Sequence, residues 1–132
     1  LKKLPKFTEK RKHNFKILYD CFKNYEDKFI LPRSLPKADP SWFAIPITVR
    51  ADAGFSKKDF VTFLEDRKIE TRMLFAGNIL KQPGYKDIEC RISGSIKNTD
   101  QVLERTFFLG VYPGMTGEKL EYIQKVIHEF FA

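Results

Sequence analysis

The chain has 132 residues, of which 42% are hydrophobic and 31% charged, and 13 are phenylalanine. This composition is typical of one globular domain with an aromatic core, and it excludes a disordered chain. The length is short for two domains, and no apolar run could span a bilayer.

The formal net charge of +7 is unevenly spread. Residues 1–12 hold six Lys or Arg against one Glu, whereas the remaining residues hold 18 against 16 acidic ones. A basic segment can bind nucleic acid, so a nucleic-acid-binding α+β module is one hypothesis. Base-stacking aromatics and a known binding motif are missing, which makes that partner unlikely.

Cys21 and Cys90 are the only cysteines, and neither belongs to a metal-binding spacing. A disulfide framework is also not indicated, which favours a reducing, cytoplasmic compartment. No membrane partner is expected, because no apolar run is long enough to span a bilayer. The chain lacks a signal peptide and does not begin with Met, which suggests a piece of a longer polypeptide.

The first half predicts a helix, a proline-rich connection and a strand. The helix covers residues 8–25, with Thr8 as N-cap and an aromatic stripe on one face. A short strand is expected over residues 29–31. Residues 42–49 are the clearest strand, which Pro46 places at a sheet edge or a bulge.

A second helix over residues 57–68 is the best specified. Ser56 and Asp59 have the spacing of a capping box, and Phe55 with Phe60 has that of a hydrophobic staple. With the strand before it and a strand over residues 70–76, this helix predicts a β-α-β unit.

Three further elements follow. Apolar and charged residues alternate over residues 85–97, as on a half-buried strand. A short helix over 98–105, a strand over 106–111 and a helix over 117–131, capped by Thr116, complete the chain. The sum is an α+β fold: a small, mostly antiparallel sheet of three to four strands covered by helices.

Ligand contacts are most plausible at the end of the 70–76 strand. Arg72, Asn78 and Gln82 lie where a strand passes into a loop, a common position for binding residues. The competing interpretation is an ordinary turn with a surface arginine paired to Glu70 or Asp66. No catalytic motif is present, so no catalytic residue, cofactor ligand or metal ligand is assigned.

Several stretches resemble one family across essentially the whole chain. They are PSWFAIPIT at 40–48, TRMLFAGN at 71–78, QP at 82–83, NTD at 98–100 and GVYPG at 110–114. They are similar to the C-terminal part of the CDP-4-keto-6-deoxyhexose 3-dehydrases of lipopolysaccharide O-antigen biosynthesis. That group belongs to the pyridoxal-phosphate (PLP) dependent sugar aminotransferases and dehydrases, which have the aspartate aminotransferase fold.

The resemblance implies a single C-terminal small domain over residues 1–132, of the kind found in fold-type I PLP enzymes. Residues 1–25 would be its leading long helix, and the large PLP domain would lie upstream. The parent enzyme would remove the C3 oxygen of a nucleotide-linked 4-keto-6-deoxy sugar. It would use PLP or its pyridoxamine form and a [2Fe-2S] cluster, and this piece alone would bind neither and be inactive.

The resemblance also implies partners and alternatives. Arg72 and Asn78 match motif positions and are expected to bind substrate. The parent would be a homodimer served by an iron–sulfur flavin reductase. A nucleotide-sugar aminotransferase or a GDP-sugar 3-dehydratase of the same fold stays open, because the residue at the upstream Schiff-base position would decide.

Overall fold

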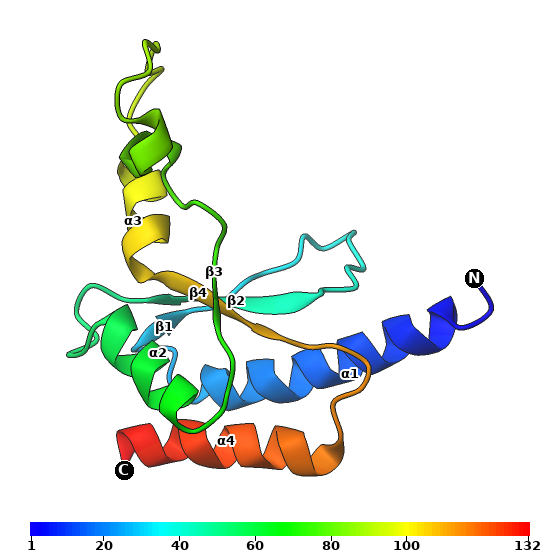
Figure 1. Ribbon diagram of the computed structural model, residues 1–132. Coiled ribbons are helices and arrows are strands. Elements are labelled where there is room, and N and C mark those ends of the chain that lie inside the picture. Colours follow the sequence, from blue (N-terminus) through cyan, green and yellow to red (C-terminus); the bar gives the residue numbers. More distant parts are fainter.

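The computed structural model describes residues 1–132. Four α-helices and four strands follow one another along the chain, with two short 3₁₀ turns between β3 and α3 (Figure 1). No helix combines the length and the apolar character needed to cross a lipid bilayer. The elements are α1 (Leu4–Lys23), β1 (Phe29–Ile30), β2 (Ala44–Val49), α2 (Lys57–Asp66), β3 (Arg72–Met73), η1 (Ile79–Lys81), η2 (Pro83–Tyr85), α3 (Lys97–Arg105), β4 (Thr106–Gly110) and α4 (Gly117–Phe131).

The four strands form one sheet in the order β1-β2-β4-β3, and every pairing is antiparallel. This confirms the predicted α+β fold. Pro46 lies opposite Phe108 of β4, but β1 ends at Ile30, opposite Thr48. At Pro46, therefore, β2 has a neighbour on one side only, as the missing proline N–H requires.

One face of the sheet carries the core. Helices α1, α2 and α4 lie together on that face (Figure 1). Four phenylalanines are at most 1% exposed: Phe22, Phe29, Phe60 and Phe107. The predicted aromatic core is confirmed. Burial of each such ring removes a large apolar area from water and is the main stabilising term.

The predicted helix signals hold in detail for α2. The Ser56 hydroxyl accepts from Asp59 N, and the Asp59 carboxylate accepts from Ser56 N at 2.9 Å, which is a complete capping box. The hydrogen bonds that the Ser56 backbone N–H and hydroxyl donate to the Asp59 carboxylate lower the pKa of Asp59. Phe55 and Phe60 lie 5.8 Å apart between ring centroids, as the hydrophobic staple predicts.

The ends of α1 and α2 differ from prediction. Helix α1 begins at Leu4 rather than Thr8, because Pro5 fits the first turn and Thr8 lies inside the helix, and it ends at Lys23 rather than residue 25. Helix α2 ends at Asp66 rather than residue 68, because Lys68 adopts a φ of +63° that no helix accommodates.

The predicted strand over 70–76 is wrong in length, and the β-α-β unit is split. Only Arg72 and Met73 pair, because Phe75 has a φ of 50° and turns the chain out of the sheet. β2 and β3 both pair with β4, which lies between them. β2 and β3 run parallel to each other but are not hydrogen bonded, because the antiparallel strand β4 lies between them.

The predicted strand over 85–97 is absent. After η2 the chain is irregular to residue 96, and Ile88 and Ile92 are about half exposed. Alternation makes a strand only where another strand supplies hydrogen bonds, and none lies here. Residues 74–105, called the arm below, instead rise from the sheet with α3 (Figure 1).

Candidate functional site

Arg72 lies on the face of the sheet that the helices leave uncovered. It pairs in register with Phe108 of β4, and residues directly opposite one another share a face. The neighbouring residue Phe107 points into the core, so Arg72 and Phe108 point away from it. Phe43 lies against Phe108, 5.6 Å between ring centroids.

The Arg72 guanidinium is exposed and forms an ion pair with Glu70. Both side chains are roughly 70% exposed, at 69% and 72%. An ion pair this accessible to water stabilises a fold by at most about 1 kcal/mol. The ion pair therefore holds Arg72 only weakly, and an anion that binds the guanidinium more tightly could displace Glu70.

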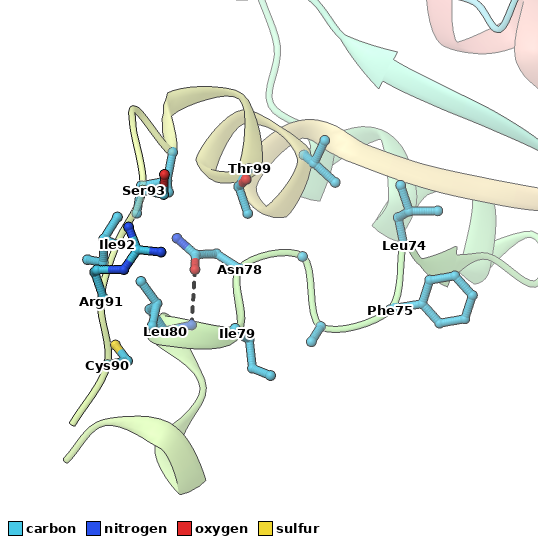
Figure 2. A pocket seen from close by; sticks show the side chains of 14 residues that line it. Leu74, Phe75, Asn78, Ile79, Leu80, Cys90, Arg91, Ile92, Ser93 and Thr99 are labelled. Atoms are coloured by element: carbon cyan, nitrogen blue, oxygen red, sulfur yellow. Dashed lines mark hydrogen bonds between the residues drawn. The ribbon is translucent and has the colours of Figure 1, made fainter. Parts of the chain in front are cut away.

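Asn78 has a different environment. Its side chain is buried, and both ends of the amide are hydrogen bonded inside the chain. Nδ2 donates to Asp100 Oδ1 at 2.7 Å. Oδ1 accepts from the backbone N–H of Leu80 at 3.0 Å, the bond drawn in Figure 2. Asn78 is thereby the N-cap of η1 and the link between β3's exit and α3.

Lys81 joins this link at the same Asp100 oxygen that Asn78 contacts. Its Nζ lies 2.9 Å from Asp100 Oδ1 and 3.7 Å from a Glu104 oxygen. The hydrogen bonds from Lys81 and Asn78 hold the pKa of Asp100 below its usual value, and the bond to Asp100 raises the pKa of Lys81. We call Asn78, Lys81 and Asp100 the polar lock of the arm.

Gln82 closes the loop rather than reaching outward. Its Nε2 donates to the carbonyl of Ala76 at 2.8 Å. Of the three residues singled out from the sequence, Arg72 is exposed on the open sheet face, whereas Asn78 and Gln82 make hydrogen bonds within the loop.

A cavity of about 610 Å³ opens beside this loop. Figure 2 shows its walls, which come from the exit of β3, the segment around Arg91 and the first turns of α3. Asn78 is at its wall, but Arg72 is not among the residues that line it. The lining is mainly apolar, with Phe75, Ile79, Leu80, Ile92 and Ile96 among its members.

A second group of titratable side chains lies between α1 and α4. His128 Nδ1 is 2.6 Å from the Tyr25 hydroxyl, and its Nε2 is 4.0 Å from Cys21 Sγ. Burial raises the pKa of the Cys21 thiol to about 11, which keeps it protonated and unreactive. The sequence gives no sign of this contact, because the residues are far apart in the chain.

The comparisons with known proteins agree with this architecture. A family model described as the DegT/DnrJ/EryC1/StrS aminotransferase family matches residues 1–128. The chain belongs to the DegT/DnrJ/EryC1/StrS aminotransferase family.

Two curated proteins are similar over the whole chain. It is 40% identical to the lipopolysaccharide biosynthesis protein RfbH of Salmonella typhimurium and covers 30% of it. It is 41% identical to the dTDP-4-dehydro-2,6-dideoxy-D-glucose 3-dehydratase of Saccharopolyspora spinosa and covers 28% of it. The chain thus spans less than a third of the length of either relative.

Solved structures show the same fold. The E. coli GDP-4-keto-6-deoxy-D-mannose-3-dehydratase, solved with bound hydrated PLP, matches with a TM-score of 0.82 at 25% identity, over 96% of this chain and 32% of that one. An aminotransferase from Psychrobacter cryohalolentis matches with a TM-score of 0.85 at 17% identity, over 98% and 35%. At that lower identity the likeness concerns the fold alone.

The cavity beside the β3 exit does not by itself fit PLP, the cofactor that the family implies. The large cavity beside the arm is lined by one arginine but by no Lys, His, Asp or Glu that could serve the cofactor's aldehyde or ring nitrogen. Lys57, whose pKa burial lowers, is engaged elsewhere, donating to the carbonyl of Leu103 at 2.6 Å. No three His, Cys, Asp or Glu side chains come together as a metal site would require.

Proposed function

We propose that residues 1–132 are the C-terminal small domain of a PLP-dependent nucleotide-sugar 3-dehydratase of lipopolysaccharide O-antigen biosynthesis. The parent enzyme removes the C3 oxygen of a nucleotide-linked 4-keto-6-deoxy sugar. The observation that carries this proposal is identity of 40–41%, over every residue of the chain, to RfbH and to a sugar 3-dehydratase.

In this proposal the cofactor is held outside residues 1–132, with PLP in the preceding large domain. A [2Fe-2S] cluster and an iron–sulfur flavin reductase complete the electron supply, and the parent enzyme is a cytoplasmic homodimer. Support for the compartment comes from the two cysteines, which are both unpaired.

Arg72 and Asn78 are the proposed substrate-side residues. The exposed guanidinium of Arg72 offers a planar fork of donors that suits the diphosphate of a nucleotide sugar or the carboxylate of an amino donor. Asn78 is proposed as a positioning residue, because its hydrogen bonds to Asp100 and Leu80 hold the loop that follows Arg72. Phe108, which pairs with Arg72, and Phe43, which lies against Phe108, supply an apolar surface for a deoxysugar ring.

The test of the site is the Arg72→Lys substitution in the full-length parent enzyme. A lysine keeps the charge but loses the fork, so kcat/KM for the nucleotide sugar falls by the equivalent of about 1.5–3 kcal/mol, the worth of a hydrogen bond to a charged group. The thermal midpoint stays the same, because an exposed ion pair stabilises little.

Two matched variants separate the alternatives. Arg33→Lys changes another exposed arginine, in the loop between β1 and β2, and leaves kcat/KM unchanged. Glu70→Gln removes the Arg72 partner and does not reduce kcat/KM. Full activity in Arg72→Lys, or a loss that only follows lost stability, would make Arg72 a structural residue.

An aminotransferase that makes an amino sugar is the second candidate. It is favoured by the name of the matching family and by the aminotransferase structures that share the fold. The two reactions differ in their products, because a dehydratase removes the C3 oxygen and an aminotransferase adds an amine at C4.

A further inference from the structure

The arm, residues 74–105, is joined to the rest of the domain by one side-chain hydrogen bond. Lys57, in the first turn of α2, donates from Nζ to the carbonyl of Leu103 at 2.6 Å. The other side-chain hydrogen bonds and ion pairs of the arm stay within it. Helix α3 has no buried residue, and Figure 1 shows the arm extending away from α1 and α4, so packing against the core holds α3 only weakly.

The hydrogen bond from Lys57 caps the C-terminal end of α3. Leu103 lies in the last turn of that helix, where carbonyl groups have no partner further along the helix. A cation at this end also interacts favourably with the helix dipole. In α2 the same lysine occupies the first turn, where a cation is unfavourable, so its stabilising contact is the one with α3. Burial lowers the pKa of Lys57, while nearby Glu104 raises it, so the ammonium is partly withdrawn from water.

Leu103 also lies against the loop that leaves β3. A Cβ at Gly77 would be 2.7 Å from the Leu103 Cα, so the backbone of the loop closely approaches that of α3. Asn78 follows Gly77 directly, and its side chain donates to Asp100 in the same helix. Lys57 is therefore connected to the loop at Asn78 through Leu103.

We propose that Lys57 is a positioning residue of the proposed reaction, which fixes the loop at Asn78 relative to Arg72 on the sheet. This role rests on the proposed function, in which Arg72 and Asn78 are on the substrate side. The ladder between β3 and β4 holds Arg72, whereas Asn78 belongs to the arm, so a shift of the arm displaces Asn78 alone. A substrate that needs both residues binds only when the arm is in place, so its apparent affinity scales with the fraction of molecules in that arrangement.

The test is Lys57→Met in the full-length parent, because methionine keeps an unbranched chain but cannot donate. The substrate is the CDP-, dTDP- or GDP-linked 4-keto-6-deoxyhexose that the parent converts. We expect its KM to rise about three- to tenfold, since a hydrogen bond from a charged donor is lost. We expect kcat to stay within about twofold, because the loop is in place once substrate is bound. Lys57→Arg keeps a cationic donor and restores KM to within about twofold of the wild type.

Lys58 supplies the matched control. It is the adjacent lysine, is exposed and forms no hydrogen bond or ion pair, so Lys58→Met leaves KM unchanged. Amide hydrogen exchange of the native parent without substrate, followed by peptide mass spectrometry, gives a readout that does not depend on turnover. Exchange over residues 77–80 and 97–105 is expected to rise in Lys57→Met and to stay at the wild-type rate in Lys57→Arg and Lys58→Met, with the thermal midpoint unchanged.

An unchanged KM in Lys57→Met would overturn the proposal, as would unchanged exchange over residues 77–80 or a KM change that only follows a lowered thermal midpoint. An equal rise of KM in Lys58→Met would also overturn it, because charge near the start of α2 would then be responsible rather than the bond to Leu103. Failure of the proposed function gives a different result. A wild-type product that keeps its C3 oxygen counts against the dehydratase, while the comparison of KM and exchange among the variants still decides the role of Lys57.

Discussion

Phe22 illustrates how single aromatic side chains hold α1 to the rest of the domain. Its ring lies edge-on to Phe29 at 5.2 Å and to Phe60 at 6.3 Å between centroids. Because Phe22 is fully buried, Phe22→Ala leaves a cavity and lowers the free energy of unfolding by about 3–5 kcal/mol. Urea denaturation of residues 1–132 measures this loss.

The control for Phe22 is another phenylalanine of the same helix. Phe7 is 45% exposed on the projecting first turns of α1, so Phe7→Ala changes the stability by no more than about 0.5 kcal/mol. Equal effects at the two positions would mean that α1 does not pack as the structure describes.

The polar lock predicts a pH dependence at the base of the arm. Asp100 has a lowered pKa in the folded chain, so its stabilising contribution is present above the unfolded value of about 3.9 and is lost as the pH falls through the folded value. Lys81 has a raised pKa in the folded chain. Its stabilising contribution is present below the unfolded value of about 10.4 and is lost as the pH rises through the higher folded value.

An NMR titration checks the acid limb of this window. The side-chain amide resonances of Asn78 are expected to move with an apparent pKa below that of a free aspartate, because Nδ2 donates to Asp100. In Asp100→Asn the movement disappears. A titration midpoint at or above about 3.9 would show that the hydrogen bonds of the polar lock do not stabilise the ionised Asp100 carboxylate.

At the scale of elements, the arm leaves the sheet through Gly77. This glycine has a φ of +62°, and a Cβ there would lie 2.7 Å from the Cα of Leu103 in α3. Gly77→Ala therefore separates the exit loop from α3, which hydrogen exchange of the α3 amides detects as lost protection. Gly94→Ala shares the positive φ but meets nothing within 4 Å, so it isolates the backbone strain from the clash.

Loss of α3 protection in Gly77→Ala alone is the expected result. Equal exchange in both variants would show that strain, rather than contact with Leu103, decides the position. Unchanged exchange in both would mean that the exit of β3 does not position the arm.

What the sequence predicted follows from local physics. The caps at Ser56 and Thr116 and the helical faces depend on neighbours within a few residues, and both caps are present. The prediction of a strand over residues 85–97 was wrong. Alternation of apolar and charged residues does not show whether a second strand lies beside the segment. The contact of His128 with Tyr25 was missed for the same reason, since it joins opposite ends of the chain.

The candidate site was predicted in part. The sequence placed Arg72 and Asn78 where a strand passes into a loop. In the structure Arg72 begins the two-residue strand β3, and Asn78 lies in the loop beyond it, as the N-cap of η1. The burial of Asn78 was not foreseen, although an asparagine preceding a short helix is a known capping signal. The cavity beside the β3 exit could not be predicted from the sequence, because it depends on how residues 90–93 pack next to residues 74–80.

On the scale of the whole molecule, the two faces of the sheet have different roles. One face carries three helices and a closed aromatic core, which accounts for stability. The opposite face carries Arg72 and Phe108, and the arm extends beside it (Figure 1). The sheet therefore has one face closed by the core and one face that stays accessible to solvent.

The most direct test of the proposed function is the fate of the C3 oxygen. The full-length parent, supplied with cofactor and an electron or amino donor, is incubated with CDP-, dTDP- and GDP-linked 4-keto-6-deoxyhexoses, and the products are analysed by mass spectrometry. We expect one of these sugars to lose its C3 oxygen and keep the C4 keto group. A product that retains the C3 oxygen and carries a new C4 amine would contradict this account and identify an aminotransferase.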